Sequence, residues 1–204
     1  MNAWYTTAYA LFQFIGREFF SFRVLHADRV PKEGGVILAS NHQSFLDPPL
    51  LGISCPREIH TLARKSLFDW PILGRIFPRI NVVPLDQKRG DMGALKTFIR
   101  LANEGRATAI FPEGTRSATG ELQPAQPGLG LIIAKTLVPV VPVRIFGAYE
   151  AFPRNRKIPK SHPITVVIGE PIYFTKQDLE GAGKDVYQKL SDRVMNKIAE
   201  LSID

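Results

Sequence analysis

The stretch GVILASNHQSFLDPP, residues 35–49, joins a short apolar run to a polar loop and then to two prolines. The run GVILAS (35–40) has the length and composition of a strand that is buried on both faces. Asp47 before Pro48 is a typical helix start, because aspartate caps helix N-termini and proline is tolerated at the first helical position. A strand that leads through a loop into a helix is the repeating pattern of α/β proteins.

Apolar runs of the same character recur along the chain and alternate with segments of helical periodicity. Strands are predicted at 35–40, 80–85, 107–112, 138–147 and 164–169, with a weaker one at 59–63. Helices are predicted near 48–54, 71–77, 91–104, 128–137 and 175–201. The alternation predicts an α/β fold: a single-domain sandwich with a largely parallel mixed sheet flanked by helices. Ligands of such sheets gather where the strands end.

Two of the predicted helices carry additional signals. The segment DMGALKTFIRLANEG (91–105) has Asp91 as a candidate N-cap and Gly105 as a C-terminal stop. The last helix is amphipathic, and we expect its apolar face to pack on the sheet, although a partner helix is an alternative. That face consists of Val186, Leu190, Val194, Ile198 and Leu201.

Composition limits the class of protein. The chain has 204 residues, of which 45% are hydrophobic and 22% charged, as is ordinary for one globular domain. The single Cys55 excludes an internal disulfide framework and fits a reducing compartment. The net charge of +7 suits a polyanion, such as nucleic acid, a phosphorylated metabolite or an anionic lipid surface. Nucleic acid is disfavoured because no helix carries a basic stripe and no known reader motif occurs.

The N-terminal segment AWYTTAYALFQFIGREFFSF (3–22) is unusually aromatic. Trp and Tyr favour the bilayer interface, because their rings combine an apolar body with a polar tip. No run in the chain reaches the roughly 18 apolar residues of a membrane span. We therefore expect residues 1–25 to form a membrane-interface helix and residues 26–204 to form the main domain. The alternative is a helix packed on the domain's own core.

His42 and Asp47 lie five positions apart, and on one continuous helix they would point about 140° away from each other. A loop that turns into a helix can bring them together. If Asp47 accepts a hydrogen bond from Nδ1–H of His42, Nε2 becomes a free base in a fixed tautomer. No G-x-S-x-G elbow supplies a serine nucleophile, so a substrate hydroxyl would serve. Alternatively, Asp47 is only a helix cap and His42 a surface loop residue.

The stretch FPEGTRS (111–117) ends another predicted strand in a similar way. Gly114 allows the backbone to approach a ligand, Thr115 offers a hydroxyl, and Arg116 can grip a phosphate with two hydrogen bonds. The P-loop pattern of nucleotide-binding proteins is missing. The alternative is a polar turn with a solvated Glu113–Arg116 pair. No metal site is predicted, because the remaining histidines lack ligand-like spacing: His26, His60 and His162.

Taken together, NHQSFLD (41–47) and FPEGTRS resemble the glycerolipid acyltransferases, in particular the 1-acylglycerol-3-phosphate acyltransferases. That family carries an H-x4-D box and an E-G-T-R box in this order. The resemblance covers about residues 31–147. It extends to KSLFDWPILG (65–74), VVPLD (82–86) and VPVVPV (138–143).

The resemblance implies a role for each site residue. His42 is the base that deprotonates the free hydroxyl of a lysophospholipid, and Asp47 orients it. Glu113 contacts the glycerol portion of the acceptor or supports the loop. The acceptor phosphate is held by Gly114, Thr115 and Arg116, with Lys65 as a second cation.

The same resemblance implies a reaction and its partners. An acyl chain moves from acyl-CoA or acyl carrier protein, as co-substrate, to 1-acylglycerol 3-phosphate, giving phosphatidate without a metal or bound cofactor. The enzyme is expected to be peripheral or monotopic on the cytoplasmic face of an anionic membrane. There the basic run FPRNRKIPKSH (152–162) can meet lipid head groups, or remain a solvated loop. The alternative acceptors are another lysophospholipid, glycerol 3-phosphate or a lipid amine. The alternative functions are an acyl-chain hydrolase and a catalytically silent membrane-binding module.

Two departures from the family pattern concern the acceptor. Gln87 stands where the family usually has a basic residue, and Lys88 and Arg89 follow it. Gln126 and Pro127 stand where two lysines are frequent. Both departures affect the choice of acceptor more than the type of reaction.

Overall fold

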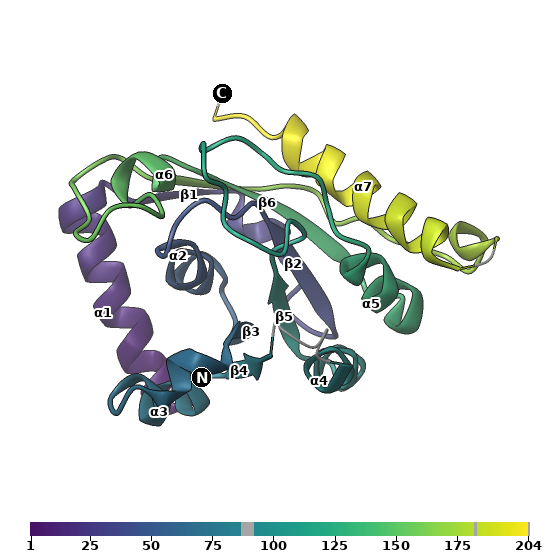
Figure 1. Cartoon of the computed structure of the whole chain (residues 1–204), viewed down its shortest axis with the longest axis horizontal. Helices are drawn as coiled ribbons and strands as arrows, with labels where there is room; N and C mark the ends of the chain where they lie inside the picture. The colour runs from purple at the N-terminus through teal and green to yellow at the C-terminus, as the bar shows by residue number, and fades with distance from the viewer. Residues whose placement is uncertain (87–91, 182, 204) are drawn as a thin grey trace.

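The computed structural model describes residues 1–86, 92–181 and 183–203 (Figure 1). Within this part of the chain, one seven-stranded sheet runs in the order β1-β7-β6-β2-β5-β3-β4. The strands are β1 (Arg23–Leu25), β2 (Val36–Ser40), β3 (Ile59–Arg64), β4 (Val82–Leu85), β5 (Ala107–Ile110), β6 (Val140–Phe146) and β7 (Thr165–Ile168). Neighbouring strands are parallel except for the antiparallel pair β6 and β7. The predicted α/β fold with a largely parallel mixed sheet is confirmed.

Helices cover both faces of the sheet. The α-helices are α1 (Ala3–Phe20), α2 (Asp47–Ser54), α3 (Leu73–Ile76), α4 (Met92–Asn103), α5 (Gly128–Thr136), α6 (Ala148–Ala151) and α7 (Lys184–Glu200). Short 3-10 helices are η1 (Ala27–Arg29), η2 (Lys65–Asp69), η3 (Phe77–Ile80) and η4 (Gln177–Leu179). Figure 1 shows α1 and α2 on one side of the sheet, and α4, α5 and α7 on the other.

The central strand β2 explains why its sequence is apolar without alternation. Val36 and Leu38 belong to one hydrophobic cluster, which includes residues of α1 and α2. Ile37 and Ala39 belong to the second cluster, which is formed with α4, α5 and α7. Because successive side chains of a strand point to opposite faces, a strand between two helical layers needs apolar residues at every position.

Most predicted helices and strands are present, with adjusted ends. The strand predicted at 138–147 is β6, and the weak prediction at 59–63 is β3. The helix predicted at 71–77 is shorter, since α3 has one turn between η2 and η3. Gly105 has φ +80 and follows α4 as expected, whereas Asp91, Gln87, Lys88 and Arg89 lie outside the described residues.

Among the strands and α-helices described, two short ones were not predicted, namely β1 and α6. The helix α1 ends at Phe20, with Ser21 as its C-cap, and residues 23–25 then pair in parallel with β7. The segment 1–25 therefore contains both α1 and an edge strand. The helix α1 itself packs on α2, with Gly16 next to Ile53 and Tyr5 next to Gly52. The N-terminal segment is therefore attached to the domain at two places, to the sheet through β1 and to α2 through α1.

The last helix packs as expected. In α7 the side chains of Val186, Leu190, Val194 and Ile198 are buried, and the helix lies against α5 and β6. The contact with α5 is close at Gly130, whose N–H donates to Ser191 Oγ at 2.9 Å. A Cβ placed at Gly130 would lie 1.9 Å from the carbonyl oxygen of Tyr187. Only glycine allows the two helices to approach this closely.

The substitution Gly130→Ala should therefore lower the free energy of unfolding by at least about 2 kcal/mol, because backbone must move to admit the methyl group. Gly128→Ala is the matched control: the residue lies in the same helix, with no atom within 4 Å of a Cβ placed there. It should leave stability unchanged or raise it by up to about 1 kcal/mol. Urea unfolding of the three proteins measures the difference, and equal losses in both variants would contradict the close contact.

Candidate active site

The two polar loops singled out in the sequence meet at the carboxyl ends of β2 and β5. These strands are adjacent and parallel, with Ala39 opposite Ile110, so the segments that follow them emerge side by side. The N–H of His42 donates to Glu113 Oε1 at 3.1 Å. The carbonyl oxygen of His42 accepts from the N–H of Ser117 at 2.8 Å. The second loop thus holds the main chain of His42 on both sides.

His42 and Asp47 form a hydrogen-bonded pair. His42 Nδ1 lies 2.8 Å from Asp47 Oδ2, and the same oxygen accepts from the N–H groups of Gln43 and Ser44 at 2.6 and 2.7 Å. Asp47 is the first residue of α2, and its fully buried carboxylate points back into the preceding loop. The helix-cap alternative is therefore not what the structure shows, because this side chain makes no capping hydrogen bond to α2.

The histidine ring is held in place but remains accessible. It stacks on the ring of Phe111, with the ring centres 4.1 Å apart and the planes inclined by 18°. The side chain of His42 keeps 17% of its surface exposed, while Asp47 has none. With the proton on Nδ1 directed to the carboxylate, Nε2 carries the lone pair and can act as a general base.

Glu113 is a buried carboxylate that supports the loop of His42. Its Oε2 accepts from Gln123 Nε2 at 2.8 Å, and its side chain is 3% exposed. Burial raises the pKa of Glu113 to about 7; the hydrogen bonds from Gln123 and His42 oppose this, and the negative charge of Asp47 adds to it. Of the two roles implied for Glu113, loop support is thus directly visible as a hydrogen bond.

The residues after Glu113 turn outward. Gly114 has φ +71, and its N–H donates to the carbonyl oxygen of Phe111 at 3.0 Å, which closes a tight turn. This left-handed conformation favours glycine. Gly114 and Thr115 are exposed at the tip of the turn, where backbone and hydroxyl groups can meet a ligand.

Arg116 returns toward the site and stacks on an aromatic ring. Its Cζ lies 3.4 Å from the centre of the Phe45 ring. Among the described residues its buried Nη1 has no hydrogen-bond partner. Burial lowers the pKa of Arg116, the positive charges of Arg154 and Arg64 lower it further, and Asp47 acts in the opposite direction. A cation with an unpaired donor and cationic neighbours is suited to an anionic ligand.

The structure brings six of the seven predicted site residues together in these two loops: His42, Asp47, Glu113, Gly114, Thr115 and Arg116. Lys65 is exposed at the start of η2, just after Arg64 at the end of β3. Strand β3 adjoins β5, so Lys65 emerges from the same edge of the sheet. Its role as a second cation stays a prediction.

Several residues that position the site were missed in the sequence. The Asn41 side chain pairs with both main-chain groups of Ile145 on β6, donating at 3.0 Å and accepting at 2.7 Å. Ser44 Oγ donates to the carbonyl oxygen of Phe152 at 2.8 Å. Gln123 links Glu113 to the carbonyl oxygen of Thr115. In the sequence, the only feature that could have pointed to these residues was the position of Asn41 and Ser44 beside His42.

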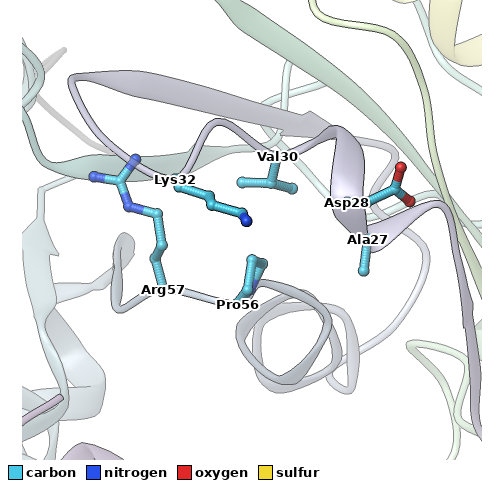
Figure 2. Close-up of a pocket in the computed structure, with 6 residues that line it drawn as sticks. All are labelled: Ala27, Asp28, Val30, Lys32, Pro56 and Arg57. Atoms are coloured by element: carbon cyan, nitrogen blue, oxygen red, sulfur yellow. The ribbon is translucent and has the colours of Figure 1, made fainter.

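A pocket of about 440 Å³ lies elsewhere, between the β1–β2 connection and the segment before β3 (Figure 2). Its residues precede β2 and β3, so it lies at the amino ends of these strands, opposite the carboxyl end of β2 that leads to His42. Arg57 there donates to the carbonyl oxygens of Pro31, Gly34 and Gly105 at 2.8–3.0 Å, which ties three loops together. We interpret this pocket as structural. In the described ranges, no three His, Cys, Asp or Glu side chains gather to hold a metal.

Comparison with known proteins identifies relatives of this fold and site. The family model Acyltransferase matches residues 21–146. The chloroplastic 1-acyl-sn-glycerol-3-phosphate acyltransferase BAT2 of Brassica napus is 36% identical over 80% of this chain, which spans 45% of that protein. The 1-acyl-sn-glycerol-3-phosphate acyltransferase of Bacillus subtilis is 30% identical, over 74% of this chain and 73% of that protein.

A solved structure agrees with the fold. The crystal structure of the 1-acyl-sn-glycerophosphate acyltransferase PlsC from Thermotoga maritima superimposes with a TM-score of 0.74 at 25% identity. The match covers 98% of this chain and 79% of that one. The likeness therefore includes α1 and α7 as well as the segment matched by the family model.

The raised pKa of Glu113 makes a prediction for stability. The folded protein holds this proton up to a pKa of about 7, whereas the unfolded chain releases it near the ordinary value of 4.5. The wild type should therefore lose stability, relative to Glu113→Gln, as the pH rises from about 5 to about 8. The glutamine keeps an oxygen acceptor for the N–H of His42 and cannot ionise.

Urea unfolding of both proteins at the two pH values isolates this effect, because all other titrating groups are common to them. A difference between wild type and variant that does not change with pH would show that Glu113 titrates with the same pKa in the folded and unfolded states.

Proposed function

Since this chain belongs to the acyltransferase family, we propose that it moves a fatty acyl chain from a thioester donor to the free hydroxyl of 1-acylglycerol 3-phosphate. The product is phosphatidate. The observation that carries the proposal is the His42–Asp47 pair, held at 2.8 Å in a loop whose main chain is bonded to the E-G-T-R loop. The names of the relatives from Brassica napus and Bacillus subtilis support this acceptor.

The proposed reaction needs one base and two bound substrates. His42 Nε2 takes the proton of the acceptor hydroxyl while that oxygen attacks the carbonyl carbon of the thioester. The new carbon–oxygen bond forms, the carbon–sulfur bond breaks, and the proton passes from the imidazolium to the leaving thiolate. Asp47 stabilises the imidazolium and fixes the ring, as in a catalytic triad whose hydroxyl comes from the substrate.

The acceptor phosphate is assigned to the arginine side of the site. Arg116 offers a guanidinium whose Nη1 has no partner among the described residues, next to the exposed turn of Gly114 and Thr115. Acyl-CoA and acyl carrier protein are both proposed as donors. Neither this reaction nor phosphate binding needs a metal or a bound cofactor in the proposal.

Removal of the base should abolish turnover. His42→Ala should lower kcat by about 10²–10⁴-fold, the usual contribution of general base catalysis, and Asp47→Asn should cause a loss of similar size. Transfer of radiolabelled acyl chains to lysophosphatidate, from CoA and carrier-protein donors, measures the effect. The control is His26→Asn, because His26 is exposed, lies before β2 and has φ +62, which asparagine tolerates.

Thermal unfolding of each variant must match the wild type, so that lost label reports chemistry. Equal label from wild type and His42→Ala would remove His42 from the mechanism. Absence of label from the wild type with every donor and with several acceptors would favour a catalytically silent membrane-binding module.

We also propose that α1 attaches the enzyme to the membrane interface, on the cytoplasmic face. Trp4, Phe14 and Phe19 are 56%, 62% and 58% exposed, although they belong to the most aromatic segment of the chain. They lie on a side of α1 that is not packed on α2, so burying them in the lipid head-group region removes apolar surface from water. Within the described ranges, no helix has the length and hydropathy needed to cross a bilayer.

Phe14→Ser should weaken binding to vesicles of anionic phospholipid by about tenfold, because one large apolar side chain is lost from the interface. The stability of the protein should not change, since the side chain is exposed. Ala10→Ser, on the same helix and also exposed, adds the same hydroxyl without removing a ring and should bind as the wild type does. Vesicle co-sedimentation measures both, and equal binding of the two variants would contradict the assignment.

A further inference from the structure

The mouth of the site contains a stack of side chains from three separate segments. Phe45, from the loop before α2, contacts the ring of Phe152 with ring centres 5.7 Å apart. The guanidinium of Arg116 lies 3.4 Å over the same Phe45 ring. Ser44 Oγ donates to the Phe152 carbonyl oxygen at 2.8 Å, which fixes the segment after α6 against the loop of His42.

Two further arginines lie near Arg116, Arg154 through this stack and Arg64 through the sheet. Arg154 follows Phe152 by two residues, inside a turn closed by the N–H of Arg156 and the carbonyl oxygen of Pro153 at 3.1 Å. Arg64 ends β3, the neighbour of β5, and so emerges at the edge that also carries the Arg116 loop. The charges of both residues act on Arg116, since they lower the pKa of its guanidinium.

None of the three arginines forms an ion pair within the described ranges. The ion pairs of this part of the chain involve other residues. In the nearby carboxylate of Asp47, Oδ2 pairs with His42 and accepts from two main-chain N–H groups, while Oδ1 has no hydrogen-bond partner among the described residues. Like charges that gather without an ion-pair partner destabilise the protein unless an anion joins them. Such a cluster is typical of a ligand site.

We infer that Arg64 and Arg154 complete, with Arg116, a three-sided cradle for the phosphate of the acceptor, and that this cradle selects a phosphomonoester. The inference rests on the proposed function. A monoester presents three oxygens and about two negative charges, enough for three guanidinium groups. A phosphodiester head group has fewer free oxygens and one charge, so it satisfies the cradle less well.

The cradle also accounts for the two positions at which this sequence departs from the family pattern. Neither Gln87 nor the pair Gln126 and Pro127 supplies the basic groups that are usual in the family. Arg154 comes from a segment beyond the family model, which ends at residue 146. Cations from β3 and from the α6–β7 segment then supply the charge at the phosphate.

The test compares Arg64→Gln and Arg154→Gln with wild type at fixed neutral-detergent concentration, which removes attraction to an anionic surface. Acceptors are lysophosphatidate, a monoester, and lysophosphatidylglycerol, a diester. Each variant should raise the KM for lysophosphatidate by about tenfold to a hundredfold, the usual effect of losing a charge-assisted hydrogen bond. The kcat should stay within about twofold, because the phosphate takes no part in the bonds that form and break. The preference for the monoester should fall accordingly.

Arg156→Gln is the matched control, since it removes an exposed arginine from the same turn. It should retain the wild-type KM. An unchanged KM in both cradle variants, with an active wild type, would overturn the cradle and leave the proposed function intact. Equal KM increases in all three variants would show a diffuse basic surface and also overturn it. A wild type that transfers label to neither lysophospholipid would overturn the proposed function itself.

Discussion

The site depends on the way in which the main chain of one residue is held. The N–H and carbonyl groups of His42 are both bonded to the loop after β5, through the Glu113 carboxylate and the N–H of Ser117. These two bonds join the loops that carry His42 and Arg116, the proposed base and the proposed phosphate ligand. The alignment of β2 and β5 in one parallel sheet makes this possible, because it brings both loops to the same edge.

Holding His42 in this way requires a carboxylate where water is largely excluded. Burial raises the pKa of Glu113 to about 7, although two hydrogen bonds stabilise its charged form. Asp47 is also fully buried, and its Oδ2 accepts three hydrogen bonds. Two acids this close repel each other when both are charged. The fold therefore gives up stability near neutral pH to fix the histidine, as is common at functional sites.

Much of the fold was predictable because the sheet is covered on both faces. A strand such as Val36–Ser40 must be apolar throughout, so it stands out from the polar loops and amphipathic helices around it. The elements that were missed are too short to show a period: β1 has three residues and α6 has four. Their conformations depend on pairing with β7 and on packing after β6, which are tertiary effects.

For the site, the family resemblance predicted that Asp47 pairs with His42 and that the two loops meet, whereas the spacing of the residues alone left both open. The sequence left Asp47 with two readings, cap or partner of His42, and only the three-dimensional path of the loop decides between them. Asn41 bonds to a strand far along the chain and Gln123 to another loop, so apart from the position of Asn41 beside His42 no local pattern marks them. Arg154 could not be assigned to the site from the sequence either, because it comes near Arg116 only through the contact of Phe152 with Phe45.

The segment after α6 links the site to the aromatic helix. One end is fixed at the site, where Phe152 accepts from Ser44. The other end is fixed to α1, where Ser161 Oγ donates to the Phe19 carbonyl oxygen at 2.8 Å, and Figure 1 shows α6 beside that end of α1. A lipid surface that covers the exposed Phe19 is thus adjacent to the segment that carries Arg154. In the arrangement we propose, the acceptor keeps its acyl chain in the bilayer while its phosphate reaches the arginines, since one short segment borders both.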